Sequence, residues 1–303
     1  MSGSPLSAGT SRTSSGIPVI RVAVRRPARR KLFSSAKTAS SLLLLLIALS
    51  FCLPLLWVLL ASINPDASLA VEWPAHPSLE NFAAIMNAKT TFRPIWNSLL
   101  LCGLATLVTV VCSALAAYPL SRYRSRGTRP LLLTLIFATG LPITAIMIPV
   151  YAMFVQINLI DSWAGTILFL ATSSLPYSIF LMKNFMDAVP KDVEESAWTE
   201  GASTMQALRF VVLPLMKPGT AVVTIFTFVV MWGNFFVPFM LLLSPDKLPA
   251  SVSLYTFSSQ YGQVAYGQLA AFSLVYSLPV VLLYLVLGRR FSTAFTAVDG
   301  MKD

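Results

Sequence analysis

Six long stretches without an Asp, Glu, Lys, Arg or His residue run through this chain of 303 residues. They cover residues 39–63, 95–120, 130–160, 162–182, 218–244 and 268–288. Each is long enough to cross about 30 Å of hydrocarbon as an α-helix. Lipid offers the backbone no hydrogen-bond partners, and no stretch alternates like a membrane barrel strand, so helices are the remaining solution. The sequence therefore predicts an all-α membrane protein with six transmembrane helices, in a domain over residues 39–290.

The positions of the Lys and Arg residues predict the orientation of these helices. Nineteen of the 22 precede the first stretch, follow the last, or fall between the second and third or between the fourth and fifth. Only Lys89, Arg93 and Lys247 fall in the other connections. Because short loops rich in Lys and Arg stay in the cytoplasm, both termini are predicted to be cytoplasmic. This topology also accounts for the net charge of +10, so no nucleic-acid partner is predicted.

Two tails flank the predicted membrane domain. Residues 1–38 are rich in Arg and Ser and contain no acidic residue. That composition favours a basic, disordered cytoplasmic tail, although an organelle transit peptide has a similar composition and is the alternative. Residues 291–303 are predicted to form a short cytoplasmic tail at the other end.

Acidic residues cluster in one connection, the loop of residues 183–218. The cluster consists of Asp187, Asp192, Glu194, Glu195 and Glu200. Asp192 followed by Glu195 fits a capping box at the start of a short helix, and Gly201 suits the left-handed residue that ends one. Ser203 followed by Gln206 repeats the box, and Leu213-Pro214 is expected to break the second helix.

The same loop contains residues at the spacing of a known signature. Glu195-Ser196-Ala197 is followed by Gly201, by Val211 and by Leu213-Pro214. This pattern resembles the inner-loop signature of permease subunits of bacterial ABC importers, often called the EAA motif. Two departures are small, since Ser196 stands at the middle Ala and Glu200 stands where such permeases often have Asp.

Other parts of the chain are most similar to the maltose-type sugar permeases, and specifically to the partner with six spans. The shared pieces are Asn97-Ser98, Ala117-Tyr118, Leu141-Pro142, Ile148-Pro149, the segment from Trp232 to Pro238, and Asp299-Gly300-Met301-Lys302. Gly233-Asn234 departs from the family's usual Asn-acid pair. The resemblance implies a type I ABC importer permease fold in the bacterial plasma membrane, and the departure leaves the cargo open.

The resemblance further implies that the loop docks on a separate ATP-hydrolysing subunit. The residues expected to couple this chain to the ATPase are Asp192, Glu194, Glu195, Ala197, Trp198, Glu200, Gly201, Ala202, Leu213 and Pro214. Glu194 and Glu195 are expected to pair with basic residues of the partner, while Ala197 and Trp198 fill an apolar cleft. The implied partners are a second homologous permease, two copies of the ATP-binding subunit, an extracytoplasmic solute-binding protein, and membrane lipid.

The chain's own residues exclude other sources of energy and other chemistry. It has no Gly-rich loop that ends in Lys and Ser or Thr, so ATP and Mg²⁺ are expected on the partner and no cofactor in this chain. The apolar stretches also lack the ionisable residues that relay protons or form catalytic or metal sites. We therefore expect a transport subunit rather than an enzyme, with an ATP-independent six-span carrier as the alternative.

Neutral polar and aromatic residues within the stretches suit a sugar or oligosaccharide, which is held by hydrogen bonds and by stacking on rings. The candidates for the substrate pathway are Asn97, Tyr118, Tyr151, Tyr177, Trp232, Asn234 and Phe235. Each could instead join helices or pack in the interfacial belt. Glycerol-phosphate or a polyol is the alternative cargo, although the stretches offer no Arg or Lys for a phosphate.

Overall fold

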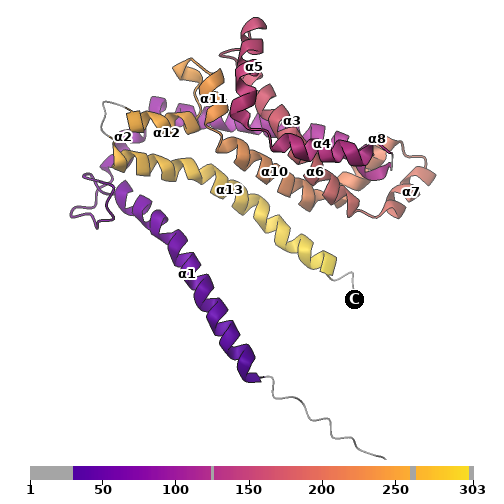
Figure 1. Ribbon diagram of the computed structural model, residues 1–303, viewed down its shortest axis with the longest axis horizontal. Coiled ribbons are helices and arrows are strands. Elements are labelled where there is room, and N and C mark those ends of the chain that lie inside the picture. Colours follow the sequence, from indigo (N-terminus) through magenta and orange to yellow (C-terminus); the bar gives the residue numbers. More distant parts are fainter. Residues whose placement is uncertain (1–29, 124–125, 260–263, 300–303) are drawn as a thin grey trace, which may run out of the picture. The chain divides into compact units, whose positions relative to one another are not determined.

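The computed structural model describes residues 30–123, 126–259 and 264–299, which form helices joined by turns and contain no strand. The chain divides into two units, Met1–Pro54 and Leu55–Asp303. The elements are α1 (Arg30–Ser62), α2 (Glu80–Ile85), η1 (Ala88–Phe92), α3 (Arg93–Arg122), α4 (Thr128–Thr139), α5 (Ile143–Gln156), α6 (Trp163–Asp187), α7 (Lys191–Thr199), α8 (Thr204–Ala207), η2 (Leu208–Val212), α9 (Leu213–Leu215), α10 (Lys217–Trp232), α11 (Phe236–Leu241), η3 (Pro245–Lys247), α12 (Ala250–Ser259) and α13 (Tyr266–Asp299), of which most are labelled in Figure 1. The predicted all-α class is confirmed.

Four helical segments among the described residues are long and apolar enough to cross a membrane by themselves. They are Ser40–Ser62, Ala88–Arg122, Trp163–Asp187 and Tyr266–Val286. Two further pairs of helices reach the required length together but are sharply bent. By length and composition, the described part of the chain thus has four spans, or six if each bent pair counts as one.

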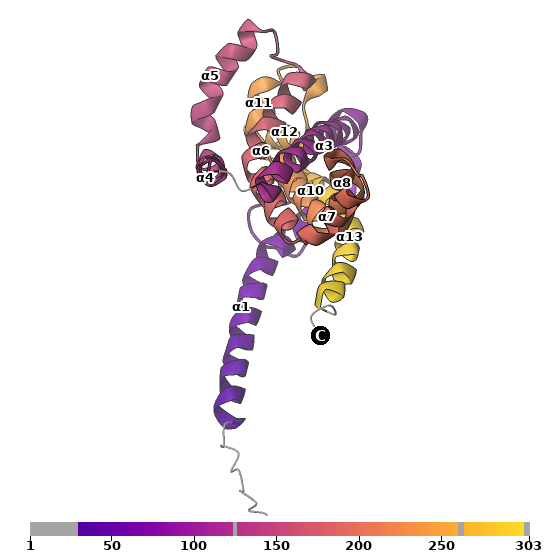
Figure 2. The ribbon, with the colours of Figure 1, turned by 90° about the vertical axis from the view of Figure 1, so that its right-hand side faces the viewer.

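The first bent pair replaces the single helix predicted over residues 130–160. Helix α4 ends at Thr139, α5 begins at Ile143, and the two axes differ by 92°. Pro142 separates them, and proline disfavours helical backbone at the residue before it. The prediction of one continuous helix here is therefore wrong, and Figure 2 shows α5 turning away from α4.

The predicted span over residues 218–244 is also interrupted. Helix α10 ends at Trp232 and α11 begins at Phe236. Between them the Asn234 side-chain oxygen accepts a hydrogen bond from the Val237 amide at 3.0 Å. Asn234 therefore satisfies a backbone amide at the start of α11, as short polar side chains do at helix N-termini.

The helix expected to break at Leu213-Pro214 instead continues past that point. The π-helix η2 leads directly into α9, which has Pro214 in its first turn, where proline is tolerated. The bend follows at Met216, where the axis of Thr204–Leu215 meets that of α10 at 82°. The predicted position of this break is wrong by two residues.

Helices α1 and α13 extend into the two predicted tails. Helix α1 begins at Arg30 rather than at residue 39, and α13 continues past residue 290 to Asp299. Residues 1–29 and 300–303 lie outside the described residues. The disorder predicted for the first tail thus falls largely outside the described residues, and residues 30–38 are helical.

Three buried clusters are found among the described residues of the unit Leu55–Asp303, and two of them surround the functional residues. The first, which we call the Trp232 cluster, joins α3, α5, α6, α10 and α11. The second, which we call the Met186 cluster, joins the last turns of α3 and α6 to the loop of residues 183–218 and to α10. Close approach of α10 to α6 depends on Gly219, because a Cβ atom there would lie 2.4 Å from the Phe185 ring. Figures 1 and 2 both show α10 beside α6.

Asp161 ties the turn before α6 to the segment after α11. Its backbone φ is +54°, and its amide donates to the Leu241 carbonyl at 2.8 Å. Its carboxylate accepts from the amides of Leu243 and Ser244, both at 2.9 Å, and from the Lys247 ammonium at 2.7 Å. The Lys247 ammonium, followed by the Ser244 hydroxyl and amide, holds the pKa of Asp161 well below its usual range.

We expect Asp161→Asn to lower the thermal unfolding midpoint of the purified chain at pH 7. A carboxyl whose pKa is depressed by folding contributes stability that is complete above its unfolded pKa, about 3.9, and is lost as the pH falls toward the folded pKa. The difference in midpoint between wild type and variant should therefore be large at pH 7 and smaller at pH 3. Asp246→Asn is the matched control, because its ion pair with Arg93 is solvent-exposed, the carboxylate side chain at 77%, and such pairs contribute little. Equal midpoints for wild type and Asp161→Asn at pH 7 would contradict the assignment.

Candidate functional site

Helix α7 begins directly after a proline and not at a capping side chain. Pro190 occupies the N-cap position, and no side chain caps the helix there. Asp192 and Glu194 lie in the first turn, where negative charge complements the helix dipole. The predicted capping box of Asp192 and Glu195 is therefore wrong, because the helix begins one residue before Asp192.

The end of α7 agrees with the prediction made from Gly201. This residue has a φ of +92°, which glycine adopts without strain. The Gly201 amide donates to the Trp198 carbonyl and the Ala202 amide donates to the Ala197 carbonyl, both at 3.0 Å. These two bonds form a Schellman motif, which satisfies carbonyls left free at the end of the helix.

The predicted capping box at Ser203 is confirmed. The Gln206 amide donates to the Ser203 hydroxyl at 3.4 Å, and the Ser203 amide donates to the Gln206 side-chain oxygen at 2.8 Å. The segment from Lys191 to Gln206 is thus a helix, a glycine stop and the start of a second helix, and local hydrogen bonds satisfy the end of the first helix and the start of the second. Such a segment holds its shape at a surface.

The loop exposes acidic and apolar side chains together. Among the predicted coupling residues, Asp192, Glu195, Glu200, Gly201 and Pro214 are exposed, Trp198 is 38% exposed, and Ala197, Ala202 and Leu213 are partly buried. The exposed apolar side chains Val193, Met205 and Phe210 accompany them. An exposed apolar surface with charged neighbours is typical of a protein contact. We call Asp192, Val193, Glu195, Trp198 and Met205 the loop face.

Glu194 differs from the other acidic residues of the loop because it is buried, at 1% exposure. Its Oε2 atom lies 2.6 Å from Nε of Arg122, and its Oε1 atom accepts a hydrogen bond from the Tyr118 hydroxyl. Arg122 also donates to the Met186 carbonyl at 3.1 Å. The expected pairing of Glu194 with a partner's basic residue is therefore wrong, since its carboxylate is used within this chain to fix α7 to the end of α3.

Apolar contacts fix the second half of the loop in the same way. Leu208, Val212 and Met216 are buried in the Met186 cluster, at 3% exposure or less. They pack with Tyr118 of α3 and Met182 of α6. Both halves of the loop are thus held by the membrane helices, so a displacement of the loop must also displace α3 and α6.

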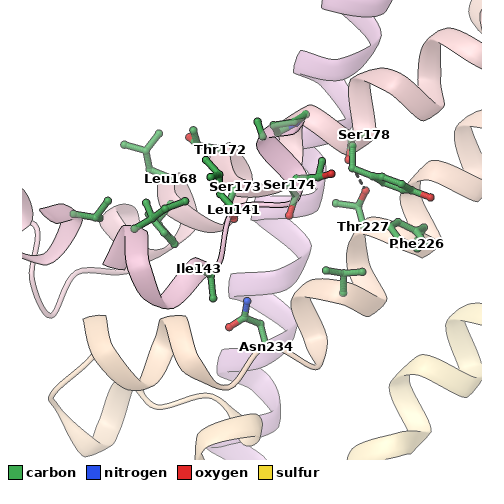
Figure 3. Close-up of a pocket in the computed structure, with 18 of the residues that line it drawn as sticks. Leu141, Ile143, Leu168, Thr172, Ser173, Ser174, Ser178, Phe226, Thr227 and Asn234 are labelled. Carbon is green, nitrogen blue, oxygen red and sulfur yellow. Dashed lines mark hydrogen bonds between the residues drawn. The ribbon is translucent and has the colours of Figure 1, made fainter. Parts of the chain in front are cut away.

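A cavity of about 640 Å³ lies between α4, α5, α6 and α10. Its polar lining comes from hydroxyl and amide groups: Thr139, Thr172, Ser173, Ser174, Ser178, Thr227 and Asn234. None of the described residues that line it carries a charge. Figure 3 shows Thr172, Ser173 and Asn234 at this cavity, with Ser178 hydrogen bonded to Thr227 at 3.1 Å. The hydroxyls of Thr172 and Ser174 form no hydrogen bond with another described residue.

Two of the seven predicted pathway residues, Tyr177 and Asn234, line this cavity. The Tyr177 ring lies 4.6 Å from that of Phe226, which also lines it. Tyr151 instead packs against the Trp232 cluster. Phe235 stacks on Phe239, with 4.9 Å between the ring centroids.

The other three predicted pathway residues form contacts that give them a structural role. The Trp232 indole donates to the Tyr276 carbonyl at 3.2 Å and stacks on its ring. The Asn97 amide donates to the carbonyls of Asp246 and Leu248, at 2.9 and 3.0 Å, and so joins α3 to η3. Tyr118 bonds to Glu194, as described above. These three residues join helices and do not line the cavity.

Comparison with known proteins places the chain in a family. Residues 109–293 match the family of binding-protein-dependent transport system inner membrane components, and the chain belongs to that family. It is 30% identical over 256 residues to the diacetylchitobiose uptake system permease protein NgcG of Streptomyces coelicolor, covering 83% of this chain and 84% of that protein. It is 29% identical to the galactooligosaccharides transport system permease protein GanQ of Bacillus subtilis, covering 85% and 93%.

A solved structure has the same fold. It is the crystal structure of a bacterial ABC transporter involved in the import of the acidic polysaccharide alginate, with a TM-score of 0.75 and 22% identity. The match covers 88% of this chain and all of the matched chain. The predicted ABC importer permease fold is thereby confirmed.

Proposed function

We propose that this chain is a membrane-spanning permease subunit of an ATP-driven importer that carries an uncharged sugar or oligosaccharide into a bacterial cell. One observation carries the proposal: the capped loop from Lys191 to Gln206 presents an exposed face while Glu194 and the Met186 cluster fix it to α3 and α6. A force applied to that face reaches the membrane helices through buried contacts. The chain itself contributes no ATP site, and a partner holds ATP and Mg²⁺.

The assembly we propose places this chain in the bacterial plasma membrane with both termini in the cytoplasm, each bent helix pair serving as one of six spans. Its partners are a second homologous permease, two copies of an ATP-binding subunit and an extracytoplasmic solute-binding protein. The distribution of Lys and Arg supports the orientation. The family is described as binding-protein-dependent, which supports the last partner.

The proposed cargo rests on the lining of the cavity and on the named relatives. Hydroxyl and amide groups, together with the rings of Tyr177 and Phe226, suit a neutral sugar, since sugars are held by hydrogen bonds and ring contacts. An acidic or phosphorylated cargo would favour a cationic partner, and the cavity's described lining has none. Relatives named for diacetylchitobiose and for galactooligosaccharides agree with a neutral sugar.

The proposal is tested by co-purification followed by reconstitution. A tagged chain should bring down a second permease and an ATPase, and neutral oligosaccharides with the binding protein should stimulate ATP hydrolysis in proteoliposomes. Tyr177→Leu should then reduce uptake by about fivefold, since loss of a ring contact is worth about 1 kcal/mol. Tyr284→Leu is the control, at an exposed ring outside the cavity. Stimulation only by glycerol-phosphate, or transport without any ATPase, would contradict the proposal.

A further inference from the structure

A second cavity, of about 580 Å³, lies where α3, α4, α6 and α7 approach one another. Unlike the first, its lining is rich in positive charge, with Arg122, Arg129, Lys183 and Lys191 against one carboxylate, Asp187. No part of the proposed cargo path or of the loop face uses these residues. The excess of positive charge therefore indicates a separate, anionic ligand.

The positive charges of this cavity are only partly compensated. Lys183 pairs with Asp187 at 2.5 Å and Arg122 pairs with Glu194 at 2.6 Å. Among the described residues, Lys191 donates to a backbone carbonyl, that of Arg122, at 3.4 Å, and to no carboxylate. Arg129 forms no ion pair with another described residue. Two cationic side chains thus face the cavity without an anion from the described chain.

A buried donor provides an independent observation at the same place. The Arg122 side chain is 4% exposed, and its Nη2 atom has no hydrogen-bond partner among the described residues. A buried guanidinium nitrogen without a partner is costly, and such groups are normally satisfied by a bound polar group. Arg122 lines the cavity, so this unsatisfied donor belongs to one of the residues of its wall.

The apolar side of the cavity favours a lipid over a soluble anion. Its wall includes Leu132, Leu133 and Ile136 of α4, a helix with no buried residue. Tyr123, at the end of α3, is 55% exposed, as aromatic residues often are at a membrane interface. Positive charge at one end of an apolar helix matches the arrangement of a phospholipid, with a headgroup above acyl chains.

We propose that this cavity binds the headgroup of an anionic phospholipid of the inner leaflet, with its phosphate near Arg122, Arg129 and Lys191 and its acyl chains along α4. The choice of leaflet rests on the proposed orientation. Because Arg122 also holds Glu194 of α7, a lipid bound here lies next to the contact that fixes the loop face to α3.

Native mass spectrometry of the full-length chain in detergent tests the site, with added phosphatidylglycerol, phosphatidylcholine or soluble glycerol phosphate. Wild type should retain phosphatidylglycerol at least about fivefold better than phosphatidylcholine, and the double variant Arg129→Gln, Lys191→Gln should lose that preference. The double variant Arg209→Gln, Lys217→Gln removes equal charge from the same predicted side, outside the cavity, and should keep it.

Three outcomes would overturn the lipid site. One is an unchanged preference in the double variant of Arg129 and Lys191, and another is equal binding of glycerol phosphate at that site. The third is loss of a co-purified ATPase from that double variant without any change in lipid, which would make the cavity a protein contact. The lipid measurement requires no transport, so a negative lipid result would not contradict the proposed import function. In the same way, a loss of transport would not change the interpretation of the lipid result.

Discussion

Glu194→Ala is expected to unfold the purified chain at a markedly lower temperature and to abolish uptake. The substitution leaves the Arg122 guanidinium buried without its carboxylate, and removing one partner of a buried ion pair typically costs roughly 3–5 kcal/mol. It also removes the acceptor of the Tyr118 hydroxyl. Helix α7 then loses its ion pair with α3. Thermal unfolding in detergent and uptake in cells measure the two effects.

A double-mutant cycle separates the pair from a general loss of packing. Arg122→Met alone should also destabilise the chain, because it leaves the Glu194 carboxylate buried and unpaired. The double variant Glu194→Ala, Arg122→Met removes both charges and should recover part of the lost stability. Glu195→Ala, one residue away and exposed, is the matched control and should leave the unfolding temperature within about 1 °C. Equal effects of Glu194→Ala and Glu195→Ala would contradict the assigned role.

Reversing the charge of the loop face is expected to abolish uptake without unfolding the chain. Glu195 is exposed and contributes no described contact that folding needs, so Glu195→Lys should leave stability nearly unchanged. A positive charge facing basic residues of the ATPase costs binding energy, so ATP hydrolysis should no longer respond to cargo. Gly201→Asp should also abolish uptake, but by straining the turn that ends α7, since it puts a side chain where φ is +92°.

The control for the loop-face variant is a charge reversal at an exposed acidic residue outside the loop. Glu72→Lys reverses an exposed acidic residue in the connection after α1, on the side predicted to face outward, and should transport normally. Membrane content and ATPase co-purification are measured for each variant. Normal uptake by Glu195→Lys, at wild-type protein level, would contradict the coupling role.

Features of the loop that depend on neighbouring residues could be predicted from the sequence. The capping box of Ser203 and Gln206 and the left-handed Gly201 are formed by residues close together in the chain. The capping box at Asp192 was wrong because Pro190 already fits the N-cap position and starts the helix earlier. The bend at Pro142 was missed because the stretch was judged by its apolar length, although the proline itself is a local signal for a break in a helix.

Features that depend on distant residues could not be predicted. The burial of Glu194 follows from Arg122, which is 72 residues away, and nothing in the loop distinguishes it from Glu195. The first cavity similarly combines α4, α5, α6 and α10, so only Tyr177 and Asn234 of its lining were among the candidates. One signal was present, the consecutive hydroxyls of Thr172, Ser173 and Ser174 within an apolar stretch.

The most direct test of coupling is site-specific photo-crosslinking in the membrane-embedded assembly. A benzophenone amino acid at Trp198, on the loop face, is compared with one at Trp73, an exposed residue in the connection after α1. We predict a covalent adduct with the ATP-hydrolysing subunit from position 198 and none from position 73. An adduct from position 73, or none with any ATPase from position 198, would contradict the account.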